Sequence, residues 1–104
     1  MTIYDFLKPT YPSINKITEE EAVKHISNAL GLEFKYNIFM CRWEADAGNG
    51  TILGVRYGYY WDGGRRFLGV DADNKRTKGG ASAPVDGIED AVAWFRKRLE
   101  EYRK

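Results

Sequence analysis

The segment from 51 to 72 carries the pattern that most restricts how this chain can fold. Between 51 and 61, large apolar side chains stand at every second position, which is the period of a β-strand with one buried face. An Asp-Gly-Gly turn follows at 62–64, where glycine accepts the positive φ angles of a tight hairpin turn. The alternation then resumes over 65–72, so this part of the sequence predicts an antiparallel hairpin.

Two further segments, one on each side of the hairpin, have the apolar spacing of amphipathic helices. Thr18 is a typical N-cap for the first, and Glu21 three residues later completes a capping box. Gly31 provides a C-terminal stop for this helix. Asp86 is the expected N-cap of the second helix, whose apolar stripe ends at Tyr102. Its acidic residues precede its basic residues, as the helix dipole favours.

The remaining segments complete the expected architecture. Residues 32–44 alternate well enough to predict a third strand, whereas 73–85 is predicted to be a mobile loop rich in glycine and basic residues. The prolines in 1–16 predict an irregular arm that packs on the domain. The expected fold is therefore an α+β single domain, 1–104, of order α-β-β-β-α. It contains a three-stranded antiparallel meander with two helices packed on one face.

Composition and charge exclude several classes of protein. A chain of 104 residues forms one domain, and its net charge of +1 is unlike the strongly basic surface of a dedicated duplex-binding protein. Cys41 is the single cysteine, so no internal disulfide can form and a reducing, cytoplasmic location is expected. The N-terminal residues do not resemble a signal peptide, and no apolar run approaches the roughly 20 residues that span a bilayer. We therefore expect no membrane partner.

The face of the predicted sheet opposite the helices provides the candidate binding surface. Aromatic and arginine side chains are interleaved around the turn at 62–64, and these residue types are enriched at the energetic centres of protein interfaces. The same rings also alternate as core residues do, and exposed arginines aid solubility, so a purely structural role is the competing interpretation. The predicted partner-binding residues are Arg56, Tyr60, Trp61, Arg65, Arg66 and Phe67, with Lys75, Arg76 and Lys78 as a basic rim.

These features predict a small non-catalytic binding protein of the inhibitor or adaptor type, whose macromolecular partner is a protein. Phage-encoded inhibitors of host defence complexes are one class of such proteins. No cofactor motif, metal-ligand set or catalytic constellation is recognisable, so no enzymatic activity, cofactor or metal is expected. The alternative is direct binding of single-stranded nucleic acid or a nucleotide by the same surface, because aromatic rings stack on bases and arginine side chains form bidentate hydrogen bonds with phosphate. The sequence does not fix the oligomeric state.

Two other interpretations have weaker support. Asp62 and Asp73-Asn74-Lys75 loosely fit the pattern of metal-dependent nucleases, in which two carboxylates hold a divalent cation and a lysine lies near the attacking water. The α-β-β-β-α order is also similar to that of the double-stranded-RNA-binding domain. That family carries lysines at the start of its last helix, whereas Asp86, Glu89 and Asp90 stand there in this chain, so the similarity is one of topology only.

Overall fold

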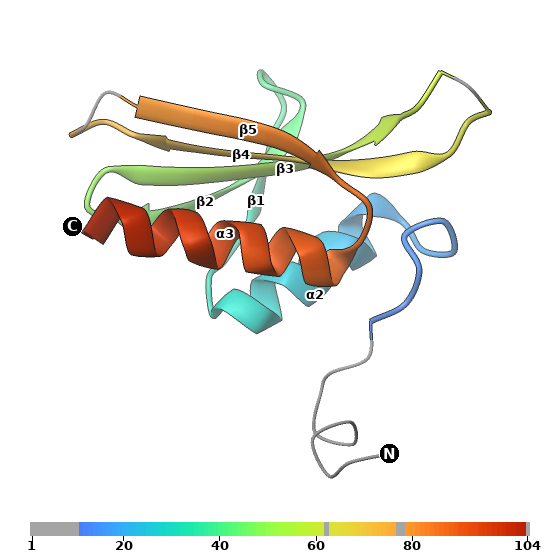
Figure 1. The fold of residues 1–104 in the computed structure, drawn as a ribbon, viewed down its shortest axis with the longest axis horizontal. Helices are drawn as coiled ribbons and strands as arrows, with labels where there is room; N and C mark the ends of the chain where they lie inside the picture. Colours follow the sequence, from blue (N-terminus) through green and yellow to red (C-terminus); the bar gives the residue numbers. More distant parts are fainter. Residues whose placement is uncertain (1–10, 62, 77–78, 104) are drawn as a thin grey trace, which may run out of the picture.

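Five antiparallel strands form one sheet in which each strand pairs with its neighbours in the sequence, in the order β1-β2-β3-β4-β5 (Figure 1). The computed structural model describes residues 11–61, 63–76 and 79–103. The helices and strands are α2 (Glu19–Leu30), β1 (Lys35–Asn37), β2 (Arg42–Gly48), β3 (Thr51–Tyr59), β4 (Arg66–Asn74), β5 (Gly79–Val85) and α3 (Ile88–Arg103).

Both helices lie on the same side of this sheet, as Figure 1 shows. α3 packs mainly against β4, and α2 packs against α3 and β3. The expected α+β class is therefore confirmed. The expected number of strands is wrong, because the sheet has five strands rather than three. One additional strand arises within 32–44 and the other within 73–85.

Residues 32–44 form two strands rather than one. The Oδ1 atom of Asn37 accepts hydrogen bonds from the backbone N–H groups of Phe39 (3.0 Å) and Met40 (3.2 Å), which closes a turn between β1 and β2. Cys41 completes this turn with a positive φ of 53°. A short polar side chain that hydrogen-bonds nearby backbone favours a turn over a strand. The alternating apolar residues of the segment conceal this signal in the sequence.

The predicted loop at 73–85 is also wrong. β4 continues to Asn74, and Gly79–Val85 form the edge strand β5. Glycine, alanine and proline are poor strand formers, so the composition of this segment gives no strand signal. Ala83 and Val85 nevertheless pack against the core, and pairing with β4 holds the segment in the sheet.

Both ends of α2 are capped by the residues that the sequence predicts. The Thr18 side chain accepts a hydrogen bond from the backbone N–H of Glu21 at 3.1 Å, and the Glu21 carboxylate accepts one from the backbone N–H of Thr18 at 3.3 Å. Gly31 ends the helix in the left-handed conformation, with a φ of 67°. The expected capping box and glycine stop are therefore confirmed.

The start of α3 corrects the predicted N-cap. The backbone N–H of Ala91 donates to the carbonyl oxygen of Gly87 at 3.1 Å, which is the first hydrogen bond of the helix. Gly87 therefore occupies the N-cap position, one residue later than predicted. Asp86 instead accepts a hydrogen bond from the hydroxyl group of Tyr60 at 3.1 Å.

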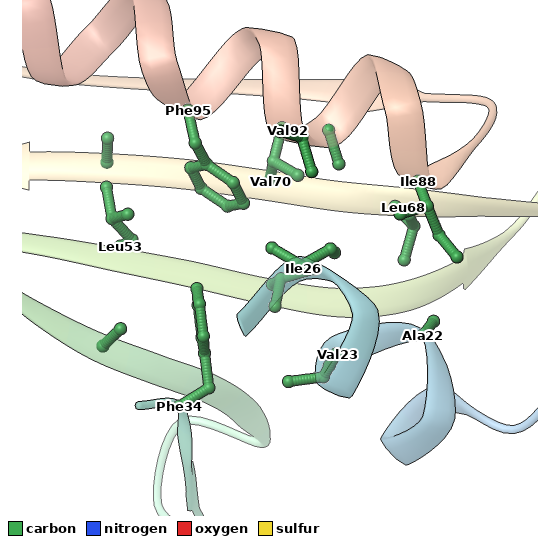
Figure 2. Close-up of a cluster of buried hydrophobic side chains, with 14 of the residues drawn as sticks. Ala22, Val23, Ile26, Phe34, Leu53, Leu68, Val70, Ile88, Val92 and Phe95 are labelled. Carbon is green, nitrogen blue, oxygen red and sulfur yellow. The ribbon is translucent and has the colours of Figure 1, made fainter. Parts of the chain in front are cut away.

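The core lies between the helix pair and one face of the sheet. Figure 2 shows side chains from α2 and α3 meeting side chains from β3 and β4. Phe95 is completely buried, and its ring lies 6.1 Å from that of Phe34. Ile14, which belongs to the predicted arm, is buried in this core, whereas residues 1–10 lie outside the described part of the chain. The largest buried side chains are Phe95, Ile14, Ile26, Leu53, Leu68, Ile88, Val55 and Val70.

Removal of a phenylalanine ring should be costly only where the ring is buried. We expect Phe95→Ala to lower the free energy of unfolding by about 3–5 kcal/mol, because it removes buried apolar surface and leaves a cavity. Phe39→Ala deletes the same ring at a position that is 91% exposed, so it should change stability by less than about 0.5 kcal/mol. Urea unfolding followed by circular dichroism measures both values. Equal losses in the two variants would contradict the described core.

Candidate binding surface on the open face of the sheet

The side of the sheet away from the helices, here called the open face, is not covered by either helix (Figure 1). Successive side chains of a strand point to opposite faces of the sheet. Because one set points into the core, the side chains at the alternate positions lie on the open face. They are Lys35 and Asn37 on β1; Arg42, Glu44 and Asp46 on β2; Ile52, Gly54, Arg56 and Gly58 on β3; Phe67, Gly69, Asp71 and Asp73 on β4; and Gly80, Ser82 and Pro84 on β5.

A chain of polar contacts crosses this face from β1 to β4. Asn37 donates from Nδ2 to Oε1 of Glu44 at 2.8 Å, and Nε of Arg42 lies 2.7 Å from Oε2 of the same carboxylate. The guanidinium group of Arg42 also forms an ion pair with Asp71 on β4. To reach Asp71, Arg42 passes over β3 at Gly54, where an added Cβ would lie 3.1 Å from three of its side-chain atoms. The glycine therefore leaves the space that this ion pair needs.

Rings and a guanidinium group stack beside the β3–β4 turn. The ring of Phe67 lies over Gly58, where an added Cβ would be only 2.2 Å from the nearest ring carbon. The ring centroid of Tyr60 is 4.8 Å from that of Phe67, and Cζ of Arg65 lies 4.6 Å from the Tyr60 ring centroid. These three side chains, together with the exposed Arg56, form the part of the predicted surface that the structure brings together.

Arg66 belongs to the opposite face of the sheet. Its guanidinium group donates to the backbone carbonyl oxygens of Ile14 (3.1 Å) and Ile17 (3.0 Å) and lies over the ring of Tyr57, with Cζ 5.3 Å from the centroid. These contacts fasten the segment before α2 to the sheet. Arg66 therefore has a structural role that the adjacent Arg65 does not share.

The predicted basic rim lies at the other end of the sheet from the aromatic stack. β4 runs from Arg66 to Asn74, a distance of about 26 Å at the usual strand rise of ~3.3 Å per residue. The backbone N–H of Lys75 donates to the carbonyl oxygen of Gly50 at 3.0 Å, beside the β2–β3 turn. Lys75 and Arg76 therefore cannot form one continuous patch with Arg65, and Lys78 lies outside the described residues.

Trp61 is the most exposed large apolar side chain among the described residues, at 98%. It follows Tyr59, which is 62% exposed at the end of β3. The strand alternation assigned both rings to the buried face of the hairpin. Their exposure shows that the hairpin extends beyond the helix layer, so its last rings have no helix to cover them (Figure 1).

A second exposed apolar segment escaped the sequence analysis. The turn between β1 and β2, here called the apolar turn, consists of residues 38–41 and exposes Ile38 by 68%, Phe39 by 91% and Met40 by 53%. In the antiparallel meander this turn leaves the sheet in the same direction as the β3–β4 turn, but it is set back from it, because Trp43 pairs with Val55 whereas β3 continues to Tyr59. The available signal was a run of three apolar residues directly after an asparagine.

The charges of the open face are mixed. Arg42 is neutralised by its two carboxylate partners, so Lys35 and Arg56 are the remaining cations of this face among the described residues. A groove of about 460 Å³ lies beside Arg56 and Phe67 and is floored by Gly58 and Gly69. The charged side chains of the open face are Lys35, Arg42 and Arg56, against Glu44, Asp46, Asp71 and Asp73.

The residues of the nuclease interpretation are not assembled into a recognisable metal site. Asp73 lies at the end of β4 with its carboxylate over Gly80, and Asp62 is outside the described residues. In the described part of the chain, no group of three or more His, Cys, Asp or Glu side chains is placed to hold a metal ion. No helix within that part is long and apolar enough to cross a bilayer.

The chain matches no known protein family, no curated protein and no solved structure. The open face and its neighbouring turns are therefore the features of the molecule that indicate its function.

A side chain at Gly58 should collide with the Phe67 ring, whereas the nearest atoms at Gly69 are 3.8 Å away. We expect Gly58→Ala to lower the free energy of unfolding by about 1–3 kcal/mol, as overpacking does. Gly69→Ala should change it by less than about 0.5 kcal/mol. Denaturant unfolding tests both. The loss of unfolding free energy caused by Gly58→Ala should largely disappear when Phe67 is also replaced by alanine. An undiminished loss in the double variant would contradict the contact between the Phe67 ring and position 58.

The acid stability of the protein should depend on Glu44. Its pKa lies below the ordinary value, first because Asn37 donates a hydrogen bond to it and then because Arg42 does, while burial opposes the shift. A carboxyl group whose pKa falls on folding stabilises the fold above its unfolded pKa, and this stabilisation is lost as the pH falls through the folded pKa.

The variant Asn37→Asp separates the two functions of this side chain. It keeps an acceptor for the turn N–H groups but replaces the amide donor by a carboxylate. The pKa of Glu44 should therefore rise, so the stability that Glu44 contributes at neutral pH should be smaller and its loss in acid should be complete at a higher pH. NMR titration of the Glu44 carboxyl carbon measures the pKa, and an unchanged value would refute the assigned role of Asn37.

Proposed function

We propose that the protein is a small non-catalytic binding protein of the inhibitor or adaptor type, which contacts a protein partner through one end of its sheet. The observation that carries this proposal is the exposure of Trp61 (98%) and Phe39 (91%) on two turns at that end. Ile38, Phe39 and Met40 are consecutive and all exposed, and a contiguous exposed apolar segment is typical of an interaction site.

The exposed rings can supply binding energy at modest entropic cost. Complete burial of a phenylalanine-sized side chain is worth about 1.5–3 kcal/mol, and aromatic side chains have few rotatable bonds to immobilise. The apolar turn is also held in shape before binding, because Asn37 accepts hydrogen bonds from two of its N–H groups. Such preorganisation lowers the cost of association.

The charge distribution favours a protein partner over nucleic acid. A phosphate backbone requires a surplus of cations on the contact surface, but the open face carries four carboxylates and three cations among the described residues, and Arg65 beside Tyr60 raises the number of cations only to four. Lys75 and Arg76, which would add positive charge, lie at the far end of the sheet. A mixed surface with apolar anchors suits a protein interface better.

Direct binding of single-stranded nucleic acid or a nucleotide is the second candidate. The stacking of Arg65 on Tyr60, beside Phe67, is the observation that favours it, because such a platform can extend onto a base. This mode predicts affinity that falls steeply with salt. It also predicts that Arg56→Glu with Arg65→Glu abolishes binding, whereas Phe39→Ala leaves it intact.

Capture from the native host with matched variants tests the proposal. Trp61→Ala and Phe39→Ala should each reduce recovery of the partner by about tenfold, which corresponds to ~1.4 kcal/mol of lost binding energy. Lys97→Ala, an exposed change on the opposite side of the molecule, should leave recovery unchanged. Mass spectrometry of the eluates measures the protein, and nucleic acid is quantified in the same samples. Equal recovery by all four baits, or nucleic acid without a protein partner, would overturn the proposal.

A further inference from the structure

β5 is an edge strand whose protection is limited to one proline, Pro84. In the sheet it pairs with β4 alone, and its seven residues, Gly79–Val85, include no charged side chain. Natural edge strands are normally shielded by charged residues, prolines, bulges or short length, because their outward N–H and C=O groups can pair with another strand. The opposite edge strand, β1, has only three residues. β5 is therefore the longer edge available for pairing.

Pro84 shows which backbone groups of β5 point outward. It stands opposite Gly69 in the antiparallel ladder, and a prolyl nitrogen has no hydrogen to donate to β4. Pro84 therefore occupies a position whose backbone groups face away from β4. By alternation, the N–H and C=O groups of Gly80 and Ser82 face the same way. These two residues give β5 a pair of outward donors.

The two ends of β5 carry opposite charge. Lys75 and Arg76 are exposed in the turn before the strand, and Asp73 offsets only one of these charges. Asp86 follows the strand directly, and Asp90 is exposed in the first turn of α3. In an antiparallel pair of β5 strands, the basic end of each copy meets the acidic end of the other. Such an edge is complementary to itself about a two-fold axis.

α3 adds apolar surface beneath this edge. Arg96 donates to the carbonyl oxygen of Ala29 in α2 at 3.1 Å, so its side of α3 faces α2. Trp94 precedes Arg96 by two positions, which places it on the opposite side of the helix at about 100° per residue. It is half-buried, with Cζ of Arg98 5.2 Å from its ring centroid. An interface limited to strand edges would be small, and this ring enlarges it.

We propose that two copies of this chain associate through β5, antiparallel about a two-fold axis near Ser82, so that their two sheets become one continuous sheet. Registers centred on Ala81 or Ser82 allow the outward N–H groups of both Gly80 and Ser82 to donate to the other copy, and Pro84 then acts only as an acceptor. This association is independent of the proposed partner-binding function. The β1–β2 turn stays accessible because β5 lies at the opposite edge from β1. The β3–β4 turn extends past the end of β5, since Val85, the last residue of β5, pairs with Leu68.

The variant Ser82→Pro removes one outward donor from each copy without removing a hydrogen bond to β4, as Pro84 already does two positions later. Ser82→Ala is the matched control, because it changes the side chain and keeps the donor. Sedimentation equilibrium should show wild type and Ser82→Ala at twice the 11.9 kDa mass of one chain, and Ser82→Pro with a dissociation constant raised at least about tenfold. Circular dichroism verifies that each variant is folded.

Asp90→Lys supplies a second test that does not alter the strand. It reverses one charge at the acidic end, so the dissociation constant should rise several-fold, and added salt should weaken the wild-type dimer. A wild-type protein that stays monomeric at the highest soluble concentration overturns the proposal. So does a Ser82→Pro protein that dimerises like wild type. If Ser82→Pro does not fold, an Asp90→Lys protein with the dissociation constant of the wild type also overturns the proposal.

Discussion

The fastening of the chain before α2 to the sheet is the constraint on which the remaining arrangement depends. The hydroxyl group of Tyr57 lies 3.0–3.2 Å from three backbone carbonyl oxygens within residues 14–18. Burial raises the pKa of this hydroxyl above its ordinary value. Glu19 adds a second tie, because its carboxylate accepts hydrogen bonds from the Trp43 indole (2.8 Å) and the Tyr57 backbone (2.9 Å). These contacts fix where α2 lies over the sheet.

With both helices on one side, the other side of the sheet must be stable in contact with water. A few polar and aromatic side chains cover the backbone of this face at glycine positions. Arg42 crosses β3 at Gly54 and forms an ion pair with Asp71, while Phe67 covers Gly58. The result is a face of mixed charge with a shallow groove. This mixed charge is the basis for proposing a protein partner rather than a polyanion.

Local signals in the sequence predicted only part of this surface. The aromatic stack around Phe67 and the exposed Arg56 were found because strand alternation separates the two faces of β3 and β4. The face on which Arg66 lies was not predicted, since neighbouring positions point to opposite faces and only the fold shows that the chain before α2 lies against Arg66. The basic rim was misplaced because closeness in sequence does not reveal that Lys75 lies a full strand away from Arg65. The apolar turn was missed because alternation also fits its residues.

The sequence by itself determined both ends of α2, the β3–β4 hairpin and the α+β class, because capping, turn chemistry and apolar period are local properties that neighbouring residues specify. Only the tertiary structure decided that Gly79–Val85 is a strand and that residues 38–41 form an exposed turn. β5 has weak intrinsic preference and exists because β4 offers it a hydrogen-bonding edge. The exposure of Trp61 likewise follows from the extension of the β3–β4 hairpin beyond the helix layer, which no local pattern encodes.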